Sequence, residues 1–95
     1  MLLSVLEQGA GHGYDLARRV AERSGGHLAV PEGSLYPALH RLERQSLVTS
    51  TWATADGRRR RVYRLTRGGR RAAVRARDDW ASFSRAVDAV MVPVS

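Results

Sequence analysis

The chain has 95 residues, 43% of them hydrophobic, which suits one folded domain and excludes both a disordered chain and a two-domain protein. The absence of cysteine excludes a disulfide framework and a thiolate metal site, and no apolar run approaches the roughly 20 residues that cross a membrane. Sixteen basic residues against nine acidic ones give a net charge of +7, so we expect a polyanionic partner.

Two short helices are predicted at the start of the chain. The first covers residues 1–8, which are mostly apolar and good helix formers, and it ends at the Gly-Ala-Gly sequence of residues 9–11. The second covers residues 13–23, in which Leu16 and Val20 lie four residues apart and therefore share one face.

A third helix is predicted after the connector at residues 27–30. Ser34 is the predicted N-cap, which places Pro37 in the first turn, where its missing N–H costs little. The apolar side chains form one stripe, at Leu35, Ala38, Leu39 and Leu42. The polar side chains lie on the opposite side, at Tyr36, His40 and Arg44, flanked by Pro37 and Arg41.

A β-hairpin is predicted next. Residues 47–54 and 60–65 are rich in strand-forming side chains, and the Asp56-Gly57 pair between them is a strong signal for a tight turn. Alternation along the second strand turns Tyr63 and Leu65 inward.

A long last helix is predicted from its N-cap Thr66 to about Met91, and Pro93 prevents much further extension. Apolar residues spaced three and four apart form a seam on this helix that is narrower than a globular helix needs. Such a seam is typical of a helix that pairs with another helix. The predicted dimer interface is therefore Ala73, Ala76, Trp80, Phe83, Val87 and Val90.

Arginines are concentrated in one part of the chain. Ten arginines and no acidic residue lie between Arg58 and Arg77, whereas residues 1–57 carry five arginines against six acidic residues. The first four of the ten follow the predicted hairpin tip, where planar guanidinium groups suit phosphate oxygens and narrow minor grooves. This distribution predicts a local surface that meets nucleic acid.

The order of elements is that of a winged helix-turn-helix, an α+β fold. Residues 1–66 form the predicted DNA-binding domain, residues 67–91 the dimerisation helix, and residues 92–95 a tail. A helix fits the major groove, which is about 12 Å wide, while the hairpin reaches the backbone or the minor groove. The predicted DNA contacts are Ser34, Tyr36, Pro37, His40, Arg41, Arg44, Arg58, Arg59, Arg60 and Arg61.

Two sequence stretches resemble the PadR family of transcriptional regulators. One contains His12-Gly13-Tyr14 and the Gly-Ser-Leu-Tyr-Pro-Ala-Leu element of residues 33–39. The other is the Arg-rich Tyr-Arg-Leu-Thr strand of residues 57–66. Trp80 and Phe83 are similar to the last helix of the subgroup with a short C-terminal part.

The resemblance implies a homodimer that binds a palindromic operator on double-stranded DNA, usually as a repressor. It implies that Ser34, Tyr36, Pro37 and His40 lie on the recognition helix and that the last helix makes the dimer. It further implies a planar aromatic effector beside Trp80 and Phe83. Similar proteins usually have several more residues before the first helix than this chain has.

Catalysis and cofactor binding are not expected. The three histidines lie in different segments without the spacing of metal ligands, and no Gly-x-Ser-x-Gly motif frames a nucleophile. Residues 1–10 lack the basic start of a signal peptide, so we expect a cytoplasmic protein with no membrane partner.

The sequence also suggests where two further aromatic side chains lie. Tyr14 is expected to pack in the core with its hydroxyl hydrogen-bonded, whereas Trp52 faces either the core or the hairpin surface.

Two other functions are compatible with the sequence. One is that of an RNA-binding or nucleoid-coating protein without an operator. The other is a winged-helix adaptor that binds proteins, which would have no need of ten arginines in an acid-free stretch.

Overall fold

The computed structural model describes residues 1–93, apart from the side chain of Ala55. The chain forms α1 (Leu2–Leu6), β1 (Gly11–His12), α2 (Gly13–Arg23), α3 (Glu32–Arg44), β2 (Val48–Ala55), β3 (Arg58–Leu65) and α4 (Arg67–Met91). The three strands form one antiparallel sheet in the order β1-β3-β2, so the predicted α+β winged helix-turn-helix is confirmed. In the predicted tail at 92–95, the last two residues lie outside the described residues.

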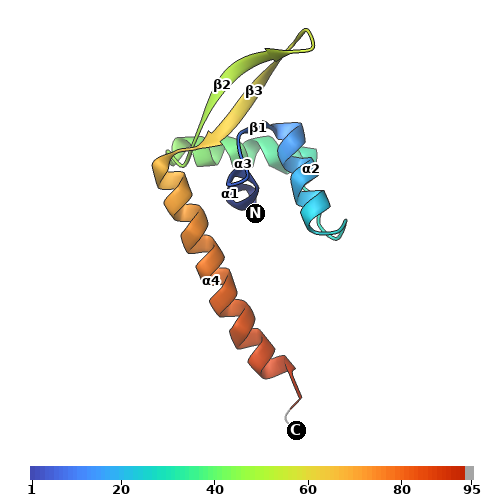
Figure 1. The fold of residues 1–95 in the computed structure, drawn as a ribbon, viewed down its shortest axis with the longest axis vertical. Coiled ribbons are helices and arrows are strands. Elements are labelled where there is room, and N and C mark those ends of the chain that lie inside the picture. The colour runs from blue at the N-terminus through green and yellow to red at the C-terminus, as the bar shows by residue number, and fades with distance from the viewer. Residues whose placement is uncertain (94–95) are drawn as a thin grey trace.

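Figure 1 shows two parts of unequal shape. The three short helices gather at the foot of the β2–β3 hairpin, and α4 leaves this body as a long arm. The molecule accordingly measures 60 × 28 × 21 Å along its principal axes. No helix within residues 1–93 is both long and apolar enough to cross a membrane.

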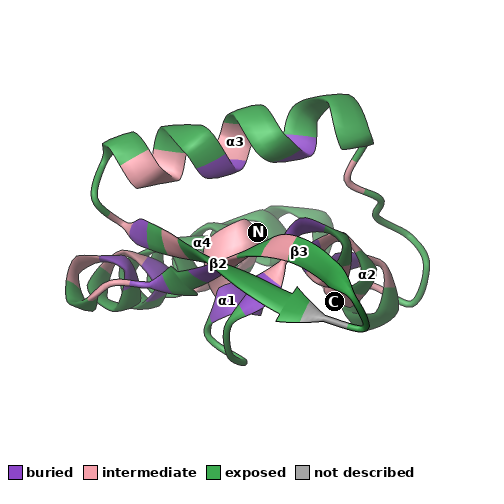
Figure 2. Cartoon of the chain, turned by 90° about the horizontal axis from the view of Figure 1, so that it is seen from above, coloured by how far each residue is buried: buried purple, intermediate pink, exposed green. Residues whose placement is uncertain are grey.

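The core lies where α1, α2, α3, β3 and the start of α4 meet. Its centre is Leu16, Leu39 and Tyr63, each less than 2% exposed. Figure 2 shows α3 with its buried residues turned toward the rest of the body and its outer face exposed. The remaining buried apolar residues are Val5, Leu6, Val20, Leu35, Val48, Leu65 and Ala73. The amphipathic stripes predicted for the second and third helices are therefore the ones that the fold buries.

The turn and cap signals in the hairpin and the last helix are confirmed. Asp56 and Gly57 have φ values of 53° and 74°, the left-handed conformations that a two-residue hairpin turn requires. Thr66 is the N-cap of α4, and its Oγ1 accepts a hydrogen bond of 3.0 Å from the backbone N–H of Gly69. Tyr63 and Leu65 face inward as predicted.

The start of α3 differs from the prediction. The helix begins at Glu32 after Pro31, and Ser34 is not its N-cap but a residue of the first turn. The hydroxyl of Ser34 donates 3.0 Å to the carbonyl of Pro31, which also accepts from the N–H groups of Ser34 and Leu35. Pro37 consequently lies inside the helix, beyond its first turn. The acidic Glu32 in the first turn interacts favourably with the helix dipole at this earlier start.

The short strand β1 was not predicted. Gly11 pairs with Tyr63 and His12 with Val62, so the segment before α2 becomes the third strand of the sheet. Arg19 fixes this segment, because its guanidinium donates to the carbonyls of Gly9 and Ala10 at 2.8 and 2.9 Å. A two-residue strand has no periodicity from which it could be predicted.

Candidate nucleic-acid interface

A groove lies between α3, the start of α2 and the wing, which we define as the β2–β3 hairpin of residues 48–65. Its volume is about 580 Å³. Four of the five wing arginines, Arg58 to Arg61, line it, together with aromatic rings from four elements, among them Tyr36 on α3 and Trp52 on β2. Guanidinium groups above aromatic rings form a surface suited to phosphates and bases.

All six candidate residues of α3 are exposed, but only two of them line the groove. Tyr36 and His40 lie on its wall. Ser34, Pro37, Arg41 and Arg44 lie on the exposed faces of the helix outside the groove. The DNA contacts expected from these residues stay predictions.

Gly13 is the residue on which the position of Tyr36 depends. A β-carbon at Gly13 would come within 2.8–2.9 Å of the hydroxyl, Cε1 and Cζ of the Tyr36 ring, which is closer than such atoms approach. Glycine therefore lets the tyrosine ring lie directly over the first turn of α2. The His-Gly-Tyr sequence was noticed in the sequence, but this contact between α2 and α3 could not be read from it.

Trp52 faces the wing surface, which settles the orientation that the sequence left open. Its side chain is 56% exposed and lies between two arginines of the neighbouring strand. The guanidinium carbons of Arg59 and Arg61 lie 5.0 and 5.3 Å from the ring centroid. The strand register places Trp52 opposite Arg61 and explains this arrangement, because Arg59 is then the diagonal neighbour on the same face.

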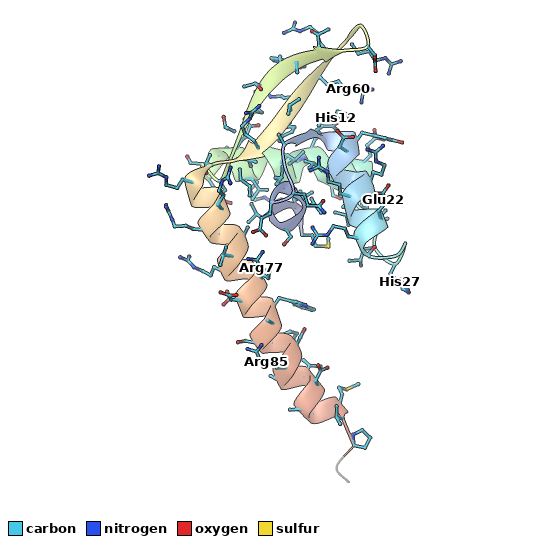
Figure 3. All side chains as sticks on the ribbon, in the orientation of Figure 1. His12, Glu22, His27, Arg60, Arg77 and Arg85 are labelled. Carbon is cyan, nitrogen blue, oxygen red and sulfur yellow. The ribbon has the colours of Figure 1, made fainter. Side chains whose placement is uncertain are left out.

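Arg60 points to the other side of the wing. Its Nη1 lies 3.0 Å from Nε2 of His12, and Figure 3 shows the two side chains approaching each other from β3 and from the start of α2. The His12 ring is the N-cap of α2, since its Nδ1 accepts a hydrogen bond of 3.3 Å from the N–H of Asp15. Arg60 thus reaches the base of the wing rather than its tip.

Arg58 and Arg59 differ from the other two groove-lining arginines in their lack of polar side-chain partners among the described residues. Arg61 donates to Ser50 and lies near Glu43, and Arg60 contacts His12. Within the described part of the chain, Arg58 and Arg59 have no ion pair or side-chain hydrogen bond. Their guanidinium groups keep all five donors for a ligand.

Tyr14 does not pack in the core, contrary to the prediction. Its side chain is 67% exposed, and its ring lies 5.9 Å from the guanidinium carbon of Arg18 on the next turn of α2. The tyrosine that packs in the core is Tyr63 of β3, which the alternation along that strand predicted to face inward. Burial raises the pKa of the Tyr63 phenol, and the carboxylate of Glu43 raises it further, so this ring stays neutral beneath the groove.

The apolar seam of α4 lies in solvent over most of its length. Trp80, Phe83 and Val90 are 66%, 58% and 83% exposed, and Val87 and Ala76 are exposed as well. Ala73 is the exception and corrects the prediction. It is 0% exposed because it packs in the core of its own chain, so it cannot contact a second copy.

Trp80 and Phe83 form a ring pair at the centre of the seam. Their centroids lie 5.6 Å apart at an interplanar angle of 40°. Within residues 1–93, no three histidine or acidic side chains come together as a metal site would require.

Comparison with known proteins relates this architecture to a family. Residues 2–75 match the Transcriptional regulator PadR-like family. The transcriptional regulator Rv3488 of Mycobacterium tuberculosis is 47% identical over 58 residues, which are 61% of this chain and 54% of that protein. The matched segment therefore spans about half the length of this relative.

Solved structures agree along nearly the whole chain. A PadR family transcription regulator from Clostridium difficile R20291 has a TM-score of 0.83 at 28% identity, covering 95% of this chain and 93% of that one. A PadR family regulator from Eggerthella lenta has a TM-score of 0.80 at 26% identity, covering 98% and 82%. The arm-like last helix is thus included in the match, together with the three short helices and the wing.

Proposed function

Because the chain belongs to the PadR-like family of transcriptional regulators, and is therefore a regulator rather than an enzyme, we propose that it is a homodimeric repressor of a two-fold symmetric DNA site. In each protomer, α3 reads one half-site in the major groove and the wing holds the adjacent phosphates. The observation that carries the proposal is the groove itself. It unites Tyr36 and His40 with four arginines on one surface.

The seam of α4 supports the homodimer. The helix has 25 residues and is roughly 37 Å long at 1.5 Å per residue, yet among the described residues Gly69 and Ala73 are its only buried ones. An exposed apolar row of this length on a small domain indicates an interface. Since the same row is present on every copy, two antiparallel or crossed α4 helices can pair symmetrically. Two half-sites about 10 base pairs apart would then face the two copies of α3.

The wing arginines are tested by the salt dependence of DNA binding. We expect the Arg58→Ala/Arg59→Ala double variant to lower the slope of log affinity against log salt concentration by about 3 to 4. Each phosphate contact contributes about 0.9, and a dimer has four of these arginines. The measurement is fluorescence anisotropy at several salt concentrations on two 30-base-pair duplexes. The selected duplex is one enriched from a random library by the unaltered protein, and the scrambled duplex has the same composition.

Two controls accompany this variant. Arg85→Ala removes an arginine near the far end of α4, where its guanidinium donates to Ser82, and should leave the slope unchanged (Figure 3). His40→Ala should reduce the preference for the selected over the scrambled duplex, because its side chain lies on the recognition helix. An unaltered slope in the double variant would refute the role of the wing. Equal binding to RNA would support the nucleoid-coating function instead.

Release of the repressor by a planar aromatic compound is a further part of the proposal. The Trp80–Phe83 ring pair supports it, because two rings at 5.6 Å in an imperfectly filled interface can accept a third ring. We expect a planar aromatic dye such as Hoechst 33342 to quench tryptophan fluorescence in the unaltered protein and in Trp52→Phe, but not in Trp80→Ala. Quenching that survives in Trp80→Ala would contradict the site.

A further inference from the structure

A polar bridge joins the recognition helix to the wing. Glu43 lies near the end of α3, Ser50 on β2 and Arg61 on β3. The hydroxyl of Ser50 donates 2.9 Å to Oε2 of Glu43 and accepts 2.8 Å from Nε of Arg61. Nη2 of Arg61 also lies 3.9 Å from the same carboxylate oxygen. One hydroxyl therefore connects an anion on the helix to a cation on the wing.

The ring of Trp52 completes the environment of Arg61. It lies opposite Arg61 in the strand register, and the guanidinium carbon is 5.3 Å from the ring centroid. Arg61 is therefore held in the chain by a hydroxyl, a carboxylate and an aromatic ring together. Arg59 stacks on the same ring but has no polar side-chain partner among the described residues. Arg59 and Arg61 therefore share a face of the wing, but only Arg61 has polar side-chain partners there.

We propose that Arg61 is a positioning residue rather than a phosphate contact, and that the Glu43–Ser50–Arg61 bridge sets the angle between the wing and α3. The inference rests on the proposed function, in which both elements contact one DNA duplex. The helix that enters the groove and the wing that contacts the backbone reach the same duplex only at a fixed relative angle. A bridge that holds this angle therefore raises the affinity for DNA without contacting DNA itself.

The negative charge of Glu43 allows DNA-binding measurements to distinguish the bridge from a simple charge effect. Glu43 is an acidic residue close to a surface that binds a polyanion, so its removal should strengthen DNA binding if only charge matters. If the bridge positions the wing, removal of Glu43 should weaken binding instead. The two explanations therefore predict opposite shifts of the dissociation constant.

The experiment measures the dissociation constant for the selected and the scrambled duplex. Glu43→Ala, Ser50→Ala and Arg61→Ala should each weaken binding to the selected duplex, on the order of fivefold. The Glu43→Ala/Arg61→Ala double variant should be no weaker than Arg61→Ala alone, because both changes break one bridge. Glu43→Gln keeps an acceptor for Ser50 and should recover part of the loss.

Arg59→Ala is the matched control on the same face of the wing. It should lower the salt slope by about 2, for one phosphate contact in each of two protomers, whereas Arg61→Ala should leave the slope unchanged. Tighter binding by Glu43→Ala, or a slope that falls in Arg61→Ala as it does in Arg59→Ala, would overturn the proposal. Failure of the unaltered protein to bind any duplex would instead count against the proposed function.

A measurement without DNA tests the bridge separately. The chain has no cysteine, so Gln45→Cys after α3 and Arg58→Cys next to the wing tip place two spin labels at exposed positions. Diluting labelled chains into unlabelled ones isolates the distance within one protomer. Glu43→Ala should broaden the distance distribution, and Arg59→Ala should not. An unchanged width in Glu43→Ala would overturn the proposal whatever the DNA experiments give.

Discussion

The Gly69→Ala variant is expected to lose at least ~3 kcal/mol of the free energy of unfolding, because a methyl group at this position overlaps a backbone atom. A β-carbon on Gly69 would collide with the carbonyl oxygen of Leu47 and would also lie 3.1 Å from Cδ2 of Leu65. The Leu47 carbonyl cannot move freely, since it accepts a hydrogen bond of 3.1 Å from the N–H of Thr66.

The stabilising effect of alanine at position 69 is smaller than the destabilisation caused by this collision. Alanine is a better helix former than glycine by about 1 kcal/mol, which would stabilise α4. Relief of the collision, however, must move either the start of α4 or the segment after α3, and so strains the N-cap bond from Gly69 to Thr66. Urea unfolding followed by circular dichroism at one protein concentration measures the difference.

Gly68→Ala is the matched control for this prediction. The nearest atom to a β-carbon at Gly68 is 3.7 Å away, which is ordinary van der Waals contact. The variant therefore keeps the gain in helix propensity without the collision and should be as stable as the unaltered protein or up to ~1 kcal/mol more stable. Equal effects at the two glycines would show that the contact with Leu47 does not matter.

The second large effect is expected at the seam of α4. The Trp80→Glu/Phe83→Glu variant should raise the dissociation constant of the homodimer by about a thousandfold. A buried interfacial tryptophan contributes ~2 kcal/mol or more, and a symmetric interface contains every residue twice. Sedimentation velocity over a range of micromolar concentrations distinguishes monomer from dimer. Affinity for the selected duplex should fall as well, because a monomer engages only one half-site.

Ser82→Glu is the control for the seam. It adds one negative charge to the same helix, where the double variant adds two, but Ser82 lies on the far side of α4 from Ala73 and outside the seam. Its dimer should dissociate no more readily than the unaltered one. A dimer of unchanged strength in the double variant would disprove the seam as the interface.

The elements that the sequence predicted best are those with a local physical signal. The hairpin followed from Asp56-Gly57, where the backbone requires two left-handed residues, and the start of α4 followed from the Thr66 cap. The buried faces of α2 and α3 followed from apolar residues three and four apart. In each case the information lies within about ten residues of the chain.

The errors arise where the outcome depends on segments far apart in sequence. Tyr14 was assigned to the core, but its side chain is 67% exposed and its ring lies beside Arg18 on the surface of α2. Ala73 belongs to the seam by spacing, yet the core covers it because α4 starts against the body. The misplaced start of α3 is a local error, because Ser34 has the side chain of a good N-cap but lies in the first turn and donates to the carbonyl of Pro31.

The candidate site, too, was predicted where the signal is local and missed where it depends on distant segments. Composition located the wing arginines correctly, since four adjacent arginines after a turn must lie near a hairpin tip. It gave no information on how they differ, because Arg60 contacts His12 and Arg61 contacts Ser50 across 48 and 11 residues respectively. Those contacts depend on strand register and on the unpredicted β1, so they become visible only in three dimensions.

The junction between α4 and the body determines which parts of the protein can be substituted independently. Burial of α4 ends at Ala73, within its first seven residues, and the ion pair between Arg77 and Glu7 holds the next turn against the end of α1. Substitutions on the exposed part of α4 beyond Arg77 can therefore alter the proposed pairing of two copies while the buried core stays unchanged. The core and the exposed part of α4 can thus be changed independently of each other, whereas the segment from Thr66 to Arg77 contributes to both.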